Sequence, residues 1–246
     1  MKSISPNLNV MIKACEKASK VLIRDFGEIE NLQVSKKGPR DFVTNSDKKA
    51  EKIIIDELLK SKKRFSILSE EAGEIKNDDS DNTWIIDPID GTLNFLHGVP
   101  HFAISIAHRC KNEILSGLIF DPIKNEMFYA EKNNGSFFNN QRIRVSNKKK
   151  IDECLFASRE KKENMTNLTI RNLGSAALDM AYVGSGRFDC FFQKNLEIWD
   201  IAAGVIIVKE AGGIINDIDL LSKSKINIIA GSNAIYENIF KKLNNF

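Results

Sequence analysis

Apolar residues recur at helical spacing near the start of the chain and predict two amphipathic helices. The Ser5-Pro6 pair is typical of an N-cap and a first helical position, and the apolar repeat that follows runs to Gly27. The polar segment Lys36–Arg40 contains two helix breakers and predicts a loop. Thr44 and Asp47 then fit a capping box, which places Asp47 in the first turn of a second helix, where the helix dipole favours its ionised form.

From Phe65 onward, short apolar runs predict strands. The run 65–69 ends at the acid pair Glu70-Glu71, the run 83–86 ends at Asp87, and the polar residues 77–82 between them predict a loop. Further strands are predicted at 102–109, 113–120, 126–131 and 136–145, and then at 153–158, 168–172, 188–193, 213–218 and 226–230. Helices are predicted at 175–184 and 199–211, with a closing helix from Asn233.

This order of elements predicts an α+β fold, a layered sandwich of helices and sheets. Residues 1–141 form an N-terminal half with two helices and a mainly antiparallel sheet, and residues 142–246 form a C-terminal α/β half. We expect the functional site to lie where the two halves meet.

Composition restricts the class of protein. The chain has 246 residues, 42% of them hydrophobic and 28% charged, which is typical of a globular protein with a sizeable core. No run approaches the ~20 apolar residues that cross a bilayer, and the start of the chain lacks a secretory signal, so we expect a cytoplasmic protein without membrane contact. The net charge of +3 does not favour nucleic-acid binding. The four cysteines are far apart and are expected to be reduced.

The segment from Trp84 to Phe95 is the most informative for chemistry. An apolar strand delivers Asp87 at its end, and Asp90 follows three residues later, before Gly91 and Thr92 open a helix. Two close carboxylates repel each other unless a cation bridges them, and hard divalent cations such as magnesium suit oxygen ligands. Amides at a helix start also bind anions, so this segment can hold metal and phosphate side by side. The alternative is a surface turn in which both aspartates only cap a helix.

Three further acidic positions favour a shared site over simple capping. Glu70 and Glu71 also end an apolar strand, Asp47 begins a helix, and Asp200 follows Trp199 at the start of an apolar helix. Acids that gather at strand ends and helix starts are typical of a metal site.

With these motifs in view, the sequence resembles the inositol monophosphatase family along nearly the whole chain. The stretch Asp87-Pro-Ile-Asp90-Gly91-Thr92 and the later Trp199-Asp200 match the two signatures of that family, and the other acids match in the expected order. The resemblance implies the layered αβαβα sandwich of the inositol monophosphatase and sugar phosphatase type. It also implies a homodimer and two to three Mg²⁺ ions, most of whose ligands lie in the N-terminal half.

The resemblance also implies individual roles. One magnesium is held by Glu70, Asp87 and the carbonyl of Ile89, a second by Asp87, Asp90 and Asp200, and a loosely bound third by Glu70 with waters. Thr92 and Asp47 orient and deprotonate the attacking water, and Gly91 and Thr92 bind phosphate. Gly174, Ser175, Ala176 and Gln193 lie at positions that contact the sugar alcohol. Lys36 lies on a mobile loop near the metals, and Glu71 orients a ligand beside Glu70.

The expected function is magnesium-dependent hydrolysis of a small phosphate monoester by metal-activated water, with inositol 1-phosphate as the first substrate. Two departures bear on specificity. Gln193 stands where relatives often have a glutamate that accepts hydrogen bonds from inositol, and the segment between Ser158 and Ile170 is short near the region where subunits and substrates meet. Related phosphatases for 3′-phosphoadenosine nucleotides, fructose 1,6-bisphosphate or histidinol phosphate are the alternative enzymes, and a regulatory binding protein is the alternative of another class.

Overall fold

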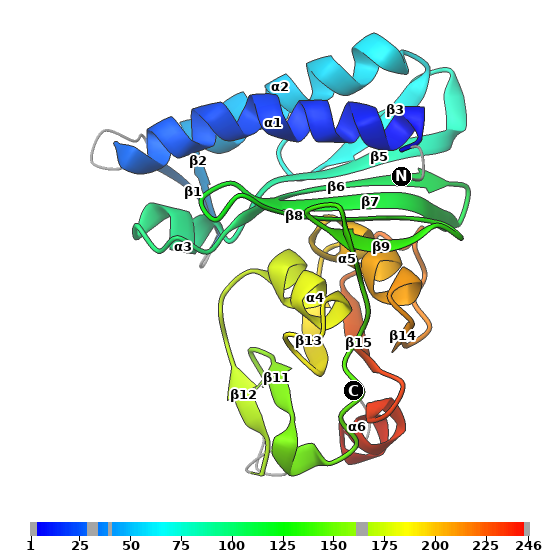
Figure 1. The fold of residues 1–246 in the computed structure, drawn as a ribbon. Coiled ribbons are helices and arrows are strands. Elements are labelled where there is room, and N and C mark those ends of the chain that lie inside the picture. The colour runs from blue at the N-terminus through cyan, green and yellow to red at the C-terminus, as the bar shows by residue number, and fades with distance from the viewer. Residues whose placement is uncertain (1–3, 29–33, 39–40, 161–166, 244–246) are drawn as a thin grey trace.

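The computed structural model describes residues 4–28, 34–38, 41–160 and 167–243. Within these ranges the chain forms helices and sheets in alternating layers (Figure 1). The helices are α1 (Pro6–Gly27), α2 (Asn45–Ser61), α3 (Thr92–Leu96), α4 (Ala176–Gly184), α5 (Ile198–Glu210) and α6 (Tyr236–Leu243). In this part of the chain, each helix is either too short or too polar to span a bilayer.

The larger sheet lies beneath α1 and α2 (Figure 1). Its strands run in the order β10-β9-β8-β7-β6-β5-β3-β4, and every neighbouring pair is antiparallel except β3 and β5. Their bounds are β3 (Phe65–Ser69), β4 (Gly73–Ile75), β5 (Asp79–Asp90), β6 (Ala103–Cys110), β7 (Glu113–Asp121), β8 (Glu126–Glu131), β9 (Gly135–Phe138) and β10 (Gln141–Ile143). A separate hairpin pairs β1 (Val34–Gly38) with β2 (Asp41–Thr44).

The smaller sheet belongs to the C-terminal part of the chain and has the order β12-β11-β13-β15-β14. Here β11 runs parallel to β12 and β13, whereas β15 is antiparallel to both of its neighbours. The bounds are β11 (Leu155–Ala157), β12 (Thr169–Arg171), β13 (Cys190–Leu196), β14 (Gly213–Ile215) and β15 (Ile226–Ser232).

Three apolar clusters hold the layers together and confirm the αβαβα sandwich. The first packs α1 and α2 against the larger sheet, through residues such as Leu22, Ile54 and Ile106. The second fills the space between the two sheets around α4 and α5, and the third packs α6 against the smaller sheet. Apolar burial drives this layering, because each helix face or sheet face must cover another. The cysteines are free, as expected.

The structure corrects two details of the sequence prediction. Residues 36–38, expected in a loop, belong to strand β1, which pairs with β2. Strand β5 begins at Asp79, inside the predicted 77–82 loop, because the amide of Asp79 donates to the carbonyl of Arg64 at 2.8 Å and pairs the polar segment with β3. The sequence also indicates a turn at Asn139-Asn140 within 136–145, and this segment is the hairpin of β9 and β10, with positive φ at both asparagines. The boundary between residues 141 and 142 stays a prediction.

Candidate active site

Strand β5 presents two aspartates on one face because the strand is irregular at that point. Asp87 lies opposite Ser105 of β6 and Asp90 lies opposite Ala103, so three residue steps on β5 match two on β6. In a regular strand, residues three apart point to opposite faces. The extra residue of this bulge brings Asp87 and Asp90 to the same face, the one that packs against α5.

Asp200 enters the site from the first turn of α5. A reciprocal capping box fixes this turn, in which the Glu197 amide donates to Oδ2 of Asp200 at 2.9 Å and the Glu197 side chain accepts from the backbone of Asp200. The hydroxyl of Ser105 on β6 donates to the Trp199 carbonyl at 3.3 Å, which ties the helix start to the larger sheet. The α5 helix thereby holds its carboxylate over the strand that carries the other two.

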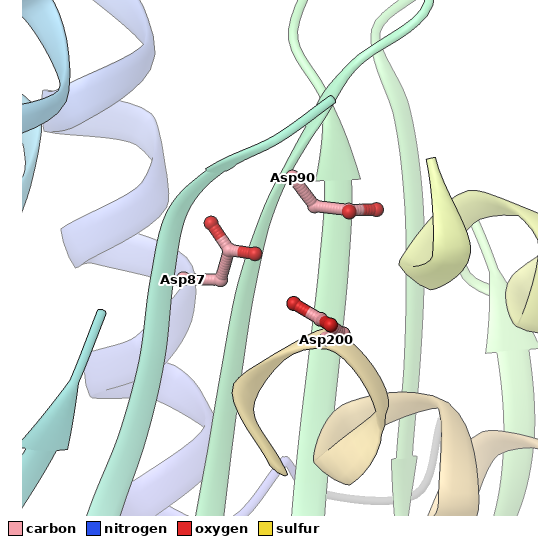
Figure 2. A group of neighbouring side chains, drawn as sticks. All are labelled: Asp87, Asp90 and Asp200. Carbon is pink, nitrogen blue, oxygen red and sulfur yellow. The ribbon is translucent and has the colours of Figure 1, made fainter. Parts of the chain in front are cut away.

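The three aspartates lie close together, Asp87 and Asp90 on β5 and Asp200 on α5 (Figure 2). Among the described residues, one oxygen from each of Asp87, Asp90 and Asp200 lies within 4.8 Å of the others. Asp87 and Asp90 are buried, at 2% and 7% exposure. A set of carboxylate oxygens at this spacing can hold a hard cation.

Burial and mutual repulsion disfavour the ionised forms of these three acids. Burial raises the pKa of Asp87 well above its usual range, and the charges of Glu70, Asp90 and Asp200 raise it further. Burial is the largest cause that raises the pKa of Asp200 to about 7, and the charge of Asp90 is the second. Burial also raises the pKa of Asp90, although hydrogen bonds from Ser175 and Ala177 oppose that shift. A bound cation would favour the ionised form of each group.

Glu70 lies beside Asp87 because β3 and β5 run in parallel. Its amide donates to the Ile86 carbonyl at 3.2 Å, and its carboxylate raises the pKa of Asp87. The turn that carries Glu70 is held from α2 by Glu51, whose Oε1 accepts hydrogen bonds from the amides of Glu71 and Ala72 at 3.0 and 3.1 Å and from the Ser69 hydroxyl. Glu71 therefore contributes its backbone to the support of its neighbour.

The side chains of Thr92 and Asp47 lie close together at the start of α3. The Thr92 hydroxyl lies 3.5 Å from Oδ1 of the fully buried Asp47 and 3.0 Å from the Ile89 carbonyl. Gly91 forms the N-cap with φ of 99°, and no side chain caps the helix. The loop of Asp87 is tightened by its own Oδ1, which accepts from the Ile89 amide at 2.9 Å.

The second half of the chain reaches the same site through the start of α4. The Ser175 hydroxyl donates to Oδ2 of Asp90 and accepts from the Leu178 amide, and the Ala177 amide donates to the same Asp90 oxygen at 2.7 Å. The Ser175 hydroxyl and the backbone of Ala176 are therefore engaged with Asp90, and the Ser175 carbonyl accepts from the Asp179 amide at 3.0 Å. Gly174 has φ of 87° in the turn before the helix.

For two of the predicted residues, Gln193 and Lys36, the structure gives the strand but no contact with the acidic cluster. Gln193 is buried on β13 and lies on the same strand face as Phe191, which packs in the core around α4 and α5. Lys36 lies on β1, and its side chain is outside the described part of the structure, as is that of Thr44.

Sequence reasoning missed two charged residues near the acids. Asp179 of α4 is buried with Oδ1 unpartnered among the described residues, and its pKa is raised well above the usual range by burial and by Asp90. The exposed Arg159, just after β11, lowers the pKa values of Asp90, Asp179 and Asp200. A lone acid in the apolar run of α4 was a signal for Asp179, whereas a single exposed arginine after a short strand gave none.

The sequence is similar to known proteins along most of its length. A sequence model described as "Inositol monophosphatase family" matches residues 4–245. An inositol-1-monophosphatase of Rhizobium meliloti (strain 1021) is 45% identical over 84% of this chain and 83% of its own length. A Nus factor SuhB of Escherichia coli (strain K12) is 40% identical over 86% of this chain and 85% of its own length.

A solved structure shows the same architecture. The extragenic suppressor protein SuhB of Bartonella henselae superposes with a TM-score of 0.92 at 45% identity, over 98% of this chain and 99% of the other. Together with the matched acidic positions, these similarities show that the chain belongs to the inositol monophosphatase family, a family of phosphatases.

Proposed function

We propose that the protein hydrolyses a small phosphate monoester in a magnesium-dependent reaction, with inositol 1-phosphate as the first candidate substrate. The observation that carries this proposal is the convergence of Asp87, Asp90 and Asp200 within 4.8 Å. The name of the Rhizobium relative supports the choice of inositol 1-phosphate.

The donor set fits magnesium. All of the converging side chains offer carboxylate oxygens, and burial with mutual repulsion disfavours their ionised forms until a cation binds. Hard oxygen ligands select magnesium over metals that prefer nitrogen or sulfur. We assign one ion to Glu70, Asp87 and the Ile89 carbonyl, and a second to Asp87, Asp90 and Asp200. Glu70 with waters would hold a third ion. Bound metal would neutralise the phosphate and lower the pKa of a water molecule.

The protein's own groups then act on the water and the ester. Asp47 accepts a proton through the Thr92 hydroxyl, 3.5 Å away, as the water oxygen bonds to phosphorus; the bond to the alcohol oxygen breaks, and that oxygen takes a proton from a solvent water. The amides of Gly91 and Thr92 hold the phosphate at the start of α3. The alcohol would bind at Gly174, Ser175, Ala176 and Gln193. Glutamine keeps an acceptor for a hydroxyl but adds donors and carries no charge.

Phosphate release from inositol 1-phosphate tests this proposal. Turnover should require magnesium, fall when lithium is added and disappear in Asp90→Asn. Asp217→Asn, on the segment that follows β14, is a control that removes a carboxylate outside the site and should keep wild-type turnover. No turnover on inositol 1-phosphate, but turnover on a 3′-phosphorylated nucleotide, fructose 1,6-bisphosphate or histidinol phosphate, would correct the substrate. Failure on the whole panel would contradict the enzyme proposal.

A regulatory binding role is the second candidate, and the relatives named Nus factor SuhB favour it. All of the residues proposed as metal ligands are present in the sequence, so such a role would accompany catalysis. Pull-down from lysate with the wild type and with Asp87→Asn tests it. A partner captured equally by both proteins would support a role independent of catalysis, whereas loss of every partner under stringent washing would leave the hypothesis without support.

A cytoplasmic homodimer remains our proposal for the protein in the cell. Light scattering after size exclusion would test the subunit count, since a dimer has twice the 27.7 kDa chain mass.

A further inference from the structure

Asn94 of α3 connects the two halves of the molecule beside the acidic cluster. Its Nδ2 donates to the His101 carbonyl and to the Leu173 carbonyl, both at 2.7 Å. His101 lies just before β6 in the larger sheet, and Leu173 lies just before Gly174 in the second half. One side-chain amide therefore ties the turn after β5 to the turn before α4.

The turns around this amide are packed closely. A Cβ on Gly174 would lie 2.9 Å from Nδ2 of Asn94, which is too close for any side chain to be accepted without movement. A Cβ on Gly91 would lie 3.2 Å from the His101 carbonyl oxygen and 3.4 Å from the Gly174 carbonyl oxygen. The Gly91 turn and the Gly174 turn thus contact each other next to Asn94, and a shift of either turn moves the other.

The turn that Asn94 holds also supports a predicted metal ligand. Residues after Gly174 bind Asp90, through the Ser175 hydroxyl and through the Ala177 amide at 2.7 Å. Asp90 in turn precedes Gly91, four residues before Asn94. Asn94, Leu173 and Asp90 are therefore joined in a closed loop of hydrogen bonds and backbone that runs through both halves.

The chemistry of the two partners explains why an amide is needed. Both partners are backbone carbonyls, which accept hydrogen bonds only, and the NH₂ group of asparagine supplies two donors. An aspartate has the same shape, but its ionised carboxylate has no donor and would face two carbonyl oxygens. Both donors of Asn94 are used within the protein, so this amide holds the turns and does not donate to substrate.

We propose that Asn94 is a positioning residue that fixes the substrate-contact turn at Gly174 against the metal-binding end of β5. This inference rests on the proposed phosphatase function. Misplacement of a binding group by about 1 Å can cost about 100-fold in rate. Loss of the two Asn94 hydrogen bonds should therefore displace both the turn that contacts the substrate alcohol and the carboxylate of Asp90.

Asn216 provides a matched control. Its Nδ2 also donates to two backbone carbonyls, those of Asp217 and Asn227, at 3.2 and 3.1 Å. Its Oδ1 accepts from the Ile229 amide at 2.6 Å, and all of these partners lie near the β14–β15 edge of the smaller sheet. Asn216→Ala removes a comparable amide bridge without touching a site residue.

The test is steady-state hydrolysis of inositol 1-phosphate by wild type, Asn94→Ala, Asn94→Asp and Asn216→Ala. We expect kcat/KM to fall about 10-fold in Asn94→Ala and about 100-fold in Asn94→Asp, and to stay within about 2-fold of wild type in Asn216→Ala. Deuterium exchange at residues 173–178 should accelerate in both Asn94 variants but not in Asn216→Ala. Wild-type kcat/KM in Asn94→Asp, or equal effects of the two alanine variants, would overturn the proposal.

The exchange measurement also separates this proposal from the proposed function. If the wild type hydrolyses no ester in the panel, the phosphatase proposal fails, and the exchange rates at 173–178 still decide whether Asn94 holds the turn. If the wild type is active and exchange at 173–178 is unchanged in Asn94→Ala, the positioning role fails alone.

Discussion

At the scale of single residues, the site is organised by hydrogen bonds to its carboxylates from the surrounding backbone. Asp90 accepts from the Ala177 amide, Asp200 from the Glu197 amide and Asp87 from the Ile89 amide. Each bond occupies one oxygen and fixes the direction of the other. The carboxylates are thus held in place for a cation although their like charges repel. The first effect can be measured as magnesium affinity and the second as a change of stability with pH.

Magnesium binding should release protons near neutral pH. The pKa of Asp200 is raised to about 7 in the metal-free protein, so part of the population must lose a proton before a cation binds. Magnesium affinity should therefore rise between about pH 6 and about pH 8. Titration calorimetry in two buffers of different ionisation enthalpy measures the protons released. Equal affinity at both pH values, without proton release, would contradict this assignment.

The same raised pKa values set the sign of the stability change. An unfolded aspartate loses its proton at about pH 3.9, whereas the folded Asp200 keeps its proton to about pH 7. In this window the folded state binds more protons, so the free energy of unfolding contributed by the site falls as pH rises. Added magnesium should reverse that fall. Comparing wild type with Asp200→Asn in urea denaturation isolates this contribution.

Glu51 should support magnesium binding without touching the metal. Glu51→Ala leaves the amides of Glu71 and Ala72 without their acceptor and should cost about 1–3 kcal/mol of stability. Magnesium affinity should fall too, because these amides hold the turn of Glu70. Glu51→Gln keeps an acceptor oxygen and should recover most of both losses. Glu210→Ala is the control, since Glu210 also accepts from two turn amides, of Asn133 and Gly135.

Urea denaturation and magnesium calorimetry on these variants give the two quantities. Glu210→Ala should lose stability and keep wild-type magnesium affinity. A Glu51→Ala protein whose magnesium affinity matches wild type would show that the turn of Glu70 holds its place without Glu51.

At the scale of elements, the site depends on how closely α5 packs on the larger sheet. A Cβ at Gly117 of β7 would lie 2.7 Å from the Ala203 carbonyl oxygen and 2.7 Å from a methyl of Ile206. A Cβ at Gly204 of α5 would lie 2.6 Å from Cβ of Met180 on α4. Glycines at these two contacts let α5 pack closely on both β7 and α4. This packing sets the position of Asp200, which α5 carries.

Gly117→Ala should therefore displace α5 and weaken the site. The added methyl meets a backbone carbonyl that cannot rotate away, so we expect a loss of about 1–3 kcal/mol from overpacking. Magnesium affinity should decrease because α5 carries Asp200. Gly27→Ala is the control, because a Cβ at that position meets nothing within 4 Å. Thermal unfolding with and without magnesium measures both effects, and a Gly117→Ala protein equal to Gly27→Ala would contradict the packing argument.

Elements with a strong pattern were predicted from the sequence, and elements set by pairing were not. The apolar stripe of α1 and the apolar run of β5 gave correct elements. Strand β4, at Gly73–Ile75, is short and mostly exposed, so its sequence carries no signal and only pairing with β3 creates it. The acids at strand ends could be predicted, because an ionisable residue next to an apolar run can be recognised from the sequence alone.

The residues that support the site were harder to predict. Asn94 and Arg159 act through partners far away in the sequence; Asn94 lies in the marked segment from Trp84 to Phe95, but nothing in that segment indicates its contact with Leu173. Which residue meets Leu173 is decided by the packing of two sheets around α4 and α5. Such contacts follow from tertiary structure alone.

At the scale of the whole molecule, the two sheets share one apolar core around α4 and α5. This core contains Ile85 of the larger sheet, Ile206 of α5 and Phe191 of the smaller sheet. Since each half buries its face against the other, neither covers its own apolar surface alone. We therefore expect both halves to unfold together.

Arg187 offers a test of that coupling. It follows α4 and makes two 2.7 Å bonds to Glu126 of β8, while its guanidinium lies 5.4, 4.9 and 4.8 Å from the ring centres of Phe128, Phe138 and Tyr182. Arg187→Ala should lose about 1–3 kcal/mol, from hydrogen bonds to a charged group and from packing of the stem. Lysine lacks the planar fork, so Arg187→Lys should recover less than half of that loss.

The measurement is urea unfolding followed by two probes, one in each half of the molecule. Trp84 lies in the larger sheet and Trp199 at the start of α5, so the single-tryptophan variants Trp84→Phe and Trp199→Phe report on different layers. Because the shared core couples the layers, both single-tryptophan proteins should unfold at the same urea midpoint when Arg187 is present. Adding Arg187→Ala should shift both midpoints by the same amount. Separate midpoints, or a shift seen by one probe alone, would show that the halves are independent folding units and that Arg187 stabilises only the layer whose midpoint moved.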